Sequence, residues 1–297
     1  MKQLAVICAA YASWDLWDSV YKQFYLNLPN FVSVYGKDSY ALITGGSEGI
    51  GKGFADALAS KGVNVILVAR NKDKLEKAKQ DIEKRFKVKV ITHSMDLSKS
   101  SEHDYRALKS KTDAVDVSLL VNNAGMISGS KLRDYSHDEV EKIISLNCTS
   151  AVHLMKLYLP NLENRGFRSG VINVGSSFGV SPMPYCSLYS ATKVFGSFMA
   201  IGTSEEYRES VDFLSYQPST VSTPGTKFDQ SWRAESVDDA VLAALKDLGR
   251  KRYTYGTIKH TFIALVLKVV PDSVLLRVLY RKLEKVYKDR QGSQGNR

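Results

Sequence analysis

The sequence predicts an α/β fold, a single domain built on a doubly wound parallel sheet. Short apolar runs of strand length alternate with longer amphipathic runs of helix length, which indicates parallel strands joined by right-handed crossovers. A glycine-rich segment lies between the first strand and the first helix of this series. The length of 297 residues and an apolar content of 44% suit one globular domain with extensions at its ends.

The expected elements follow one another in a regular order. Strands are expected at residues 39–44, 64–69, 88–95, 117–122, 170–175 and 211–216, and helices at 49–61, 73–86, 137–162 and 188–207. The run at 64–69 is apolar almost throughout, as in a strand buried on both faces. We assign residues 1–35 to a leader, 36–256 to the α/β domain and 257–297 to a C-terminal segment.

The leader begins with an apolar run that is shorter than the ~20 residues of a membrane-spanning helix. The run has the length of a signal-peptide core, but no clear small-residue cleavage site follows it. Aromatic residues at helical spacing indicate a helix lying in a membrane interface. They are Trp14, Trp17, Tyr21 and Phe24. A helix packed on the domain or on a partner subunit fits the same pattern, so both alternatives stay open.

The C-terminal segment is also amphipathic. Its first apolar run is ten residues long, contains Lys268 and is ended by Pro271. In the stretch that follows, apolar residues recur at helical spacing and the remaining positions are strongly basic, as in helices that lie on anionic membranes. A helix that caps the domain or forms an oligomer interface is the alternative. Both ends are therefore predicted to be helical, membrane-associating extensions.

The net charge indicates which partners the chain attracts, and the cysteine content indicates whether it contains disulfides or a metal site. The net charge of +10 favours anionic partners such as lipid, phosphorylated ligands or nucleic acid. Nucleic-acid binding is not predicted, because no recognition motif is present. Cys8, Cys148 and Cys186 are widely spaced and odd in number, so neither a disulfide framework nor a metal site is predicted. This cysteine usage fits a reducing compartment.

The glycine-rich segment TGGSEGIG, residues 44–51, predicts a dinucleotide site. Gly45 permits a tight turn, Gly49 lets the backbone approach a pyrophosphate, and Gly51 allows the helix to pack closely on the strand. The phosphates would then lie at a helix N-terminus, where free N–H groups favour anions. The sheet is therefore expected to be Rossmann-like.

Residues at the ends of the next two strands predict which dinucleotide binds. An acidic residue after the second strand holds the ribose 2′-hydroxyl in NAD sites, whereas Arg70 stands there in this chain and suits a 2′-phosphate. Lys74, one helical turn later, adds positive charge, and the cofactor is predicted to be NADP(H). The alternative is that Arg70 and Lys74 are ordinary solvated cations of a basic protein and do not bind a cofactor. Asp96, after the third strand, is expected to accept from the adenine amino group or to cap the next helix.

Several motifs, in order across roughly residues 38–225, resemble the short-chain dehydrogenase/reductase family. They are TGGSEGIG, Asp96, Asn122-Asn123-Ala124-Gly125, Asn147, Ser176 and Tyr189-Ser190-Ala191-Thr192-Lys193. The resemblance implies a seven-stranded sheet supported by the NNAG motif, and a catalytic set of Asn147, Ser176, Tyr189 and Lys193. The implied cofactor-binding residues are Gly45, Ser47, Glu48, Gly49, Ile50, Gly51, Arg70, Lys74, Asp96, Asn123, Ala124, Gly125, Tyr189, Lys193, Pro218, Val221 and Thr223.

These residue types suit the reduction of a ketone, in which NADPH supplies a hydride and Tyr189 donates a proton. A free phenol has a pKa near ~10, which a nearby cation lowers. Lys193 lies four residues after Tyr189, on the same helix face, and can also donate to ribose hydroxyls. Ser176 is expected to bind the carbonyl oxygen, and Asn147 to hold a water that relays protons to Lys193. Each residue alone has an ordinary structural explanation, but the four in order predict catalysis.

A closer resemblance concerns YGKDSYALITGGSEGIGKGFA, the aromatic leader and YTYGTIKHTFIALVLKVVPDSV. These segments look like the membrane-bound very-long-chain 3-oxoacyl-CoA reductases, which share a subfamily with certain 17β-hydroxysteroid dehydrogenases. The resemblance implies reduction of a 3-oxoacyl-CoA in fatty-acid elongation, at the endoplasmic reticulum membrane with the active site facing the cytosol. A homodimer is the expected assembly.

Other substrates and one other function stay open. The segment SYQPSTVSTPG is similar to 3-ketosphinganine reductases, so a steroid or a sphingoid ketone is an alternative lipid-like substrate. Pro218-Ser219 departs from the Pro-Gly that the family often has in a loop covering the nicotinamide. A non-catalytic NADP(H)-binding scaffold is the alternative from another class, and the intact Tyr189 and Lys193 argue against it.

Overall fold

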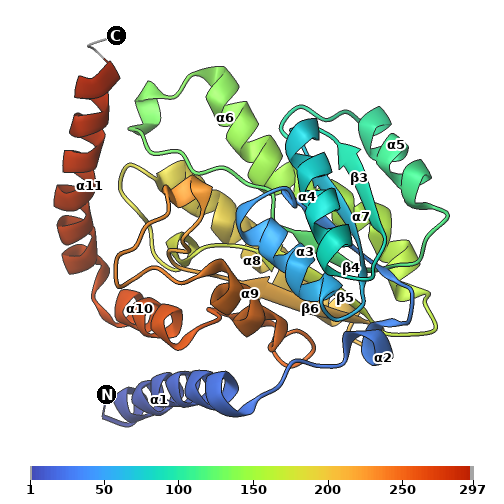
Figure 1. The fold of residues 1–297 in the computed structure, drawn as a ribbon. Coiled ribbons are helices and arrows are strands. Elements are labelled where there is room, and N and C mark those ends of the chain that lie inside the picture. Colours follow the sequence, from blue (N-terminus) through green and yellow to red (C-terminus); the bar gives the residue numbers. More distant parts are fainter. Residues whose placement is uncertain (1, 295–297) are drawn as a thin grey trace.

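The computed structural model describes residues 2–294 and contains a seven-stranded sheet with the order β3-β2-β1-β4-β5-β6-β7. All six pairings are parallel, and Figure 1 shows helices on both faces of the sheet. The strands are β1 (Tyr40–Thr44), β2 (Asn64–Ala69), β3 (Val90–Ser94), β4 (Val117–Asn122), β5 (Ser169–Val174), β6 (Val211–Tyr216) and β7 (Tyr253–Thr254). The predicted fold class, a doubly wound parallel sheet, is confirmed.

The helices of the domain alternate with these strands. They are α3 (Gly49–Ala59), α4 (Lys72–Arg85), α5 (Glu102–Thr112), α6 (His137–Ile144), α7 (Ser150–Glu163), α8 (Ser187–Glu206) and α9 (Val237–Leu245). The extensions form α1 (Lys2–Tyr25), α2 (Phe31–Tyr35), α10 (Ile258–Val269) and α11 (Asp272–Gln294). Short helical turns occur at η1 (Leu132–Asp134), η2 (Ser145–Thr149), η3 (Ser177–Gly179) and η4 (Pro224–Thr226).

Both faces of the sheet are buried, and each has its own hydrophobic core. Successive residues of a strand point to opposite faces. Ile43 and Leu67 therefore belong to the core that includes residues of α3 and α9, whereas Leu42 and Ile66 belong to the core that includes residues of α5 and α7. Because helices cover both faces of the sheet, the residues of β1 and β2 that point to either face are mostly apolar.

Three elements are not evident from the sequence pattern. Helix α5 buries only Tyr105, Leu108 and Thr112, and its other residues are mostly charged or polar, so its apolar period is weak. Helix α9 has nine residues, and strand β7 has two. The long helical region predicted at 137–162 is confirmed as helical, but it contains the π-helical turn η2 between α6 and α7.

The leader helix α1 packs on the domain through polar and charged side chains. Lys22 Nζ lies 2.5 Å from Asp247 Oδ2, and both residues are buried. Arg250 donates two hydrogen bonds to the carboxylate of Asp18, at 2.7 and 2.8 Å. The alternative of a helix packed on the domain is therefore correct for this face of α1. The division of the chain at residues 35 and 256 stays a prediction.

The membrane-associating character of the extensions also stays a prediction. Within residues 2–294, no helix combines the length and the apolar content that crossing a membrane requires.

Candidate active site

A cleft of about 980 Å³ lies where β1 and β4 meet, the point at which the strand order reverses. Ligands of open α/β sheets bind at this switch point, beyond the carboxyl ends of the strands. Most of the predicted site residues line the cleft, namely Gly45, Ser47, Glu48, Gly49, Ile50, Arg70, Lys74, Asp96, Asn123, Ala124, Gly125, Ser176, Tyr189, Lys193, Pro218, Val221 and Thr223. Gly51 and Asn147 are not among the lining residues.

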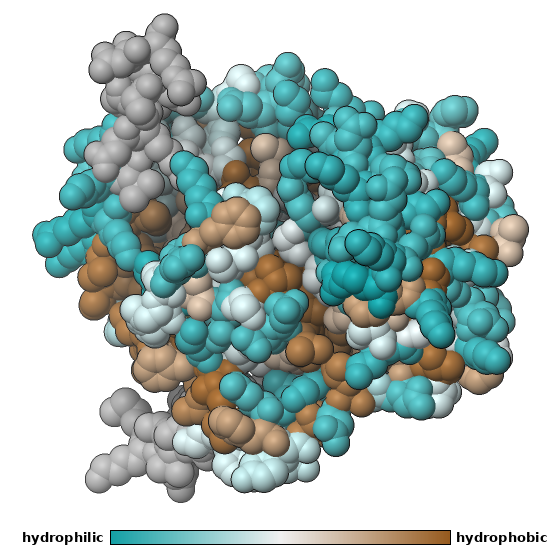
Figure 2. All heavy atoms as spheres, viewed as in Figure 1, coloured by the Kyte–Doolittle hydropathy of each residue, from teal (hydrophilic) through white to brown (hydrophobic). Residues whose placement is uncertain are grey.

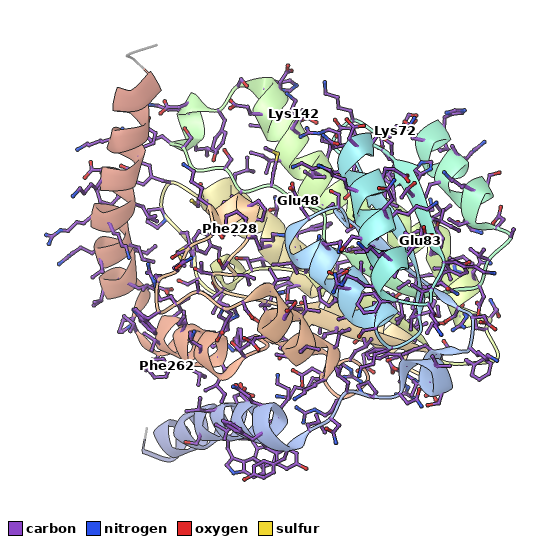
Figure 3. The ribbon with its side chains drawn as sticks, in the orientation of Figure 1. Glu48, Lys72, Glu83, Lys142, Phe228 and Phe262 are labelled. Atoms are coloured by element: carbon purple, nitrogen blue, oxygen red, sulfur yellow. The ribbon has the colours of Figure 1, made fainter. Side chains whose placement is uncertain are left out.

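The glycine-rich loop has the backbone geometry that its sequence predicts. Gly45 and Gly49 have φ values of +65° and +59°, in the left-handed region that favours glycine. A Cβ on Gly51 would lie 2.3 Å from the carbonyl oxygen of Gly45, so only glycine allows α3 to approach β1 this closely. Glu48 lies at the start of α3, next to the cleft (Figure 3). The loop therefore presents backbone and a helix N-terminus where a pyrophosphate would bind.

The NNAG motif joins the carboxyl ends of β1 and β4. The backbone N–H groups of Asn123 and Ala124 donate to Thr44 Oγ1 at 2.9 and 3.0 Å, and Asn123 Nδ2 donates to the Thr44 carbonyl at 2.9 Å. Asn122 Nδ2 donates to Asn173 Oδ1 at 2.8 Å and connects β4 to β5. These bonds are consistent with the expected supporting role. The ribose contact stays a prediction.

Arg70 and Lys74 lie at the rim of the cleft, where a 2′-phosphate would be exposed to solvent. Lys74 Nζ lies 2.7 Å from Glu48 Oε2, and both side chains are about half exposed. Asn71 caps α4 by accepting from the backbone N–H of Lys74 at 2.8 Å. Arg70 is exposed and directly precedes this cap. Both cations are thus free to turn toward an anion without breaking a buried contact.

Asp96 has a local role in the structure. Its Oδ1 accepts from the backbone N–H and the hydroxyl of Ser98, at 3.1 and 2.7 Å. Burial acts to raise the pKa of Asp96, but the Ser98 hydrogen bonds and the nearby charge of Arg70 hold it below its ordinary value. The cap of α5 is Ser101, so the alternative role of Asp96 as the cap of the next helix is wrong. Asp96 lines the cleft, and its adenine contact stays a prediction.

Tyr189 and Lys193 lie one turn apart on α8, as predicted. Lys193 Nζ is 5.5 Å from the centroid of the Tyr189 ring and donates to the Val174 carbonyl at 3.1 Å. Burial lowers the pKa of Lys193 to about 8. The Lys193 side chain, only 8% exposed, is therefore a cation that the fold keeps out of water.

The expected lowering of the Tyr189 pKa by Lys193 is wrong for this arrangement. Burial raises the pKa of Tyr189 to about 12, and the group that opposes this shift is Ser176, through a side-chain hydrogen bond. The physical reason is that Lys193 directs its ammonium group to the Val174 carbonyl rather than to the phenol. Tyr189 is therefore protonated at neutral pH and able to donate.

Ser176 is held in place by a residue that the sequence analysis did not identify. The Ser176 N–H donates to Gln217 Oε1 at 2.8 Å, and Gln217 is buried at the end of β6. A Cβ on Gly175 would lie 2.1 Å from that same oxygen, so glycine is needed beside it. Ser176 Oγ also accepts from the Phe178 N–H at 3.2 Å, which leaves the Ser176 hydroxyl proton available.

Asn147 lies in the π-helical turn η2, and both the oxygen and the nitrogen of its side-chain amide form hydrogen bonds. Its Oδ1 accepts from the Met126 N–H at 2.9 Å, and its Nδ2 donates to the Met126 carbonyl and to Thr192 Oγ1, both at 3.0 Å. A Cβ on Gly125 would lie 3.2 Å from Asn147 Oδ1 and 3.3 Å from Lys193 Nζ. Asn147 therefore holds the loop after β4 next to Lys193. Its role in a proton relay stays a prediction.

The loop after β6 closes one side of the cleft. The Pro218 carbonyl accepts from the Ser177 N–H at 2.8 Å, and Val221 pairs with Glu235 in an isolated bridge. Thr223 caps the short turn η4, which also lines the cleft. His260 Nε2 lies 3.0 Å from the Thr220 carbonyl, so α10 supports this loop from outside. Ser219, the residue that departs from the expected Pro-Gly pair, lines the cleft without a left-handed φ.

The cleft fits a dinucleotide on the observations above. Glycine positions leave room where a Cβ would collide, a helix N-terminus faces the cleft, and two solvated cations lie at its rim. At the other end, a protonated phenol, a serine hydroxyl and a buried ammonium group converge. This set of groups can hold a carbonyl and give it a proton beside a bound hydride donor.

Comparisons with known proteins agree with this geometry. A family model described as short chain dehydrogenase matches residues 39–234. The chain is 31% identical to the Homo sapiens very-long-chain 3-oxoacyl-CoA reductase over 252 residues, which covers 82% of this chain and 79% of that protein. It is 32% identical to the Danio rerio 17-beta-hydroxysteroid dehydrogenase type 3 over 253 residues, covering 82% and 80% of the two chains.

Solved structures show the same fold. A 7beta-hydroxysteroid dehydrogenase aligns with a TM-score of 0.75 at 23% identity, over 84% of this chain and 99% of the other. A short-chain dehydrogenase from Sphingobium yanoikuyae in complex with NADPH aligns with a TM-score of 0.66 at 27% identity, over 87% and 96%.

Proposed function

The chain belongs to the short-chain dehydrogenase family, and from this premise we propose that it reduces a 3-oxoacyl-CoA to the 3-hydroxyacyl-CoA, with NADPH as the reductant, in fatty-acid elongation. The observation that carries the reaction type is the convergence of Ser176, Tyr189 and Lys193 on one cleft beside the glycine-rich loop. The substrate is supported by relatives named very-long-chain 3-oxoacyl-CoA reductase at about 30% identity. The NADPH complex of a similar structure supports the cofactor.

Tyr189, Ser176 and Lys193 each have a separate role in the proposed reduction of the carbonyl group. Bound NADPH supplies the hydride that adds to the carbonyl carbon. Tyr189 donates its phenolic proton to the carbonyl oxygen, and the Ser176 hydroxyl donates a hydrogen bond to the same atom. The Lys193 ammonium lies 5.5 Å from the centroid of the Tyr189 ring, and we propose that it turns from the Val174 carbonyl toward the phenolate that remains and stabilises it. Lys193 is buried and Ser176 and Tyr189 are partly buried, so little water competes with these interactions and each one is stronger.

A steroid ketone is the second candidate substrate. The observation that favours it is the 32% identity to a 17-beta-hydroxysteroid dehydrogenase over 82% of the chain. Both candidates are lipid-like carbonyl compounds, and the catalytic residues would treat their carbonyl groups alike. The choice between them depends on the substrate end of the cleft rather than on the chemistry.

The decisive test is turnover by the purified full chain in mild detergent. NADPH oxidation would be followed with a ladder of 3-oxoacyl-CoAs, a 17-ketosteroid and ketosphinganine. We expect the highest kcat/KM with a long-chain 3-oxoacyl-CoA. A higher kcat/KM with the steroid would support the second candidate, and NADPH binding without turnover of any ketone would support the scaffold alternative.

Arg70 is proposed to read the 2′-phosphate, and Arg70→Ala should therefore weaken NADPH specifically. Loss of a hydrogen-bonded ion pair of about 1.5–3 kcal/mol predicts a rise in KM for NADPH of about 10- to 150-fold, with a change of less than about threefold for NADH. Steady-state kinetics with both cofactors measures this. The matched control is Lys72→Ala, which removes an exposed cation two residues after Arg70, at the start of α4. Equal losses for NADPH and NADH in Arg70→Ala would contradict the proposal.

The outer face of α1 supports the proposal that the enzyme lies on a membrane, at the cytosolic face of the endoplasmic reticulum. Trp14 and Trp17 are 61% and 56% exposed, and stacked rings continue from Trp17 to Tyr21 and Tyr25 with centroids 5.6 and 5.8 Å apart. Figure 2 shows hydrophobic residues gathered along the neighbouring edge formed by α10 and the start of α11. Phe262 on α10 lies on the side nearer α1 (Figure 3). Exposed aromatic and apolar residues beside basic ones suit the headgroup region.

Replacement of Trp14 and Trp17 by Ser should lower vesicle binding at least about tenfold, because two large interfacial side chains are lost. Co-sedimentation with vesicles of phosphatidylcholine and phosphatidylserine measures the partition. Phe198→Ser is the control, because Phe198 is 74% exposed and belongs to α8 rather than to either extension. Vesicle binding that falls equally in the control would contradict a specific role for α1. The expected homodimer stays a prediction.

A further inference from the structure

The C-terminal helix α11 is attached to the loop that directly precedes the helix carrying Tyr189 and Lys193. Figure 1 shows it along the edge of the domain, separated from the sheet by loops. The Tyr287 ring stacks on Tyr185 with centroids 5.0 Å apart, and the Tyr280 ring lies 5.6 Å from the same residue. Tyr185 belongs to the loop between η3 and α8, directly before the catalytic helix. We call Tyr185, Tyr280 and Tyr287 the tyrosine clasp.

The clasp also holds the loop that follows β4. The Tyr287 hydroxyl donates to Asp134 Oδ2 at 2.6 Å, and Lys131 Nζ lies 5.7 Å from the centroid of the Tyr287 ring. The Ser130 N–H donates to the Tyr185 carbonyl at 2.7 Å. Two loops and a helix from three distant parts of the sequence therefore meet at one point.

The backbone at Tyr185 shows that this contact is imposed by its surroundings. Its φ is +61°, in the left-handed region that non-glycine residues rarely adopt. Such a conformation persists only where neighbouring contacts hold it, and it is common at functional sites. Tyr185 is four residues before Tyr189, so the clasp fixes the chain directly before the proton donor.

The surface between the proton donor and this region is apolar. Phe178 lines the cleft and packs edge-on against Tyr189, with ring centroids 5.9 Å apart. Met126 and Ile127 line the same cleft, expose large apolar side chains and begin the loop that the clasp holds. A carbonyl bound at Tyr189 would therefore have apolar neighbours, and the chain that continues from Ile127 reaches the clasp three residues later, where the Ser130 N–H bonds to the Tyr185 carbonyl. Such surface suits a hydrocarbon chain rather than the phosphates of coenzyme A.

We propose that the tyrosine clasp determines specificity for long substrates by closing the outer end of the acyl passage. The hydrocarbon tail then packs on Met126, Ile127 and the clasp, whereas a short 3-oxoacyl group ends before it reaches them. This inference rests on the proposed 3-oxoacyl-CoA reductase function. It assigns α11 a part in the active site in addition to any contact with a membrane.

The test compares Tyr280→Ala and Tyr287→Ala with the wild type on acetoacetyl-CoA and 3-oxooctadecanoyl-CoA, both below the micelle concentration. We expect kcat/KM for the long substrate to fall at least about tenfold, mainly through KM, because apolar contact area is lost. The short substrate should change less than about twofold. Tyr280→Phe, which keeps the ring that packs against Tyr185, should restore the long-chain value, and the exposed Lys282→Ala is the control on the same helix.

Hydrogen exchange of residues 272–285 provides a readout that does not depend on turnover. Tyr287→Ala should raise exchange in α11, because the stack and the Asp134 hydrogen bond are lost. Equal losses for both substrates, or unchanged chain-length preference in a variant whose α11 has been released, would overturn the clasp but leave the reductase function standing. A wild-type enzyme that reduces neither substrate would instead refute the proposed function, and the clasp with it.

Discussion

Replacing Tyr189 with Phe is expected to lower kcat by about 10²- to 10⁴-fold, the usual contribution of a positioned general acid. The variant loses only the hydroxyl, and the ring can keep its edge-on contact with Phe178 at 5.9 Å. NADPH binding should therefore change by no more than a few-fold. Single-turnover kinetics and a fluorescence titration with NADPH measure the two quantities separately.

The matched control for this prediction is Tyr207→Phe, at the end of the same helix and away from the cleft. Its kcat should stay within about twofold of the wild type, since the Phe ring can keep the contact of Tyr207 with Phe213 and only a hydroxyl far from the cleft is lost. Retention of more than a tenth of the activity in Tyr189→Phe would exclude the phenol as the proton donor. The hydroxyl of Ser176, which bonds to Tyr189, would then be the group to examine.

The parts of the site that could be predicted from sequence are those in which residue type follows directly from local geometry. Gly45, Gly49 and Gly51 were predicted because no other residue fits a left-handed turn or a 2.3 Å approach. Tyr189 and Lys193 were predicted because a spacing of four residues on a helix brings two side chains to one face. The positions of the strands were predicted because a strand that is buried on both faces of a sheet needs a nearly continuous run of apolar residues.

The parts that could not be predicted depend on packing between distant segments. Gln217 supports Ser176 from the next strand, and nothing in its local sequence marks that contact. The pairing of Tyr185 with α11 joins residues that are far apart in the chain. The pKa of Lys193 depends on burial, which a sequence pattern does not reveal.

Amphipathic patterns at the chain ends illustrate a different ambiguity, because a membrane and a protein surface select the same apolar periodicity. In α1 the aromatic residues that suggested a membrane face outward. The residues that attach the helix are charged, with Asp18 bonded to Arg250 and Lys22 to Asp247. A periodic pattern does not reveal an ion pair between distant residues. Packing on the domain is therefore observed for the charged face of α1, and contact with a membrane stays a proposal for its aromatic face.

Replacing Lys193 with Met is expected to abolish turnover and at the same time stabilise the cofactor-free protein. Burial lowers the pKa of Lys193 from an ordinary value of 10.5 to about 8, so the folded state disfavours the charged form. The shift corresponds to about 3 kcal/mol at neutral pH, and loss of the hydrogen bond to the Val174 carbonyl offsets about 1 kcal/mol of it. The free energy of unfolding should therefore rise by about 2 kcal/mol at pH 7.

The pH dependence of this effect identifies its cause. Between the folded pKa and the unfolded value, the unfolded chain binds the proton that the folded protein has released, so the stability contributed at this site rises with pH. The wild type should accordingly recover relative to Lys193→Met as pH rises from about 8 to 10.5, and the difference should nearly vanish at the upper end. Urea unfolding of both proteins at pH 7 and pH 10 measures this, with the exposed Lys156→Met on α7 as control. If the difference in free energy of unfolding between Lys193→Met and the wild type does not depend on pH, the gain comes from packing of the Met side chain. Burial of the Lys193 ammonium would then not destabilise the folded protein.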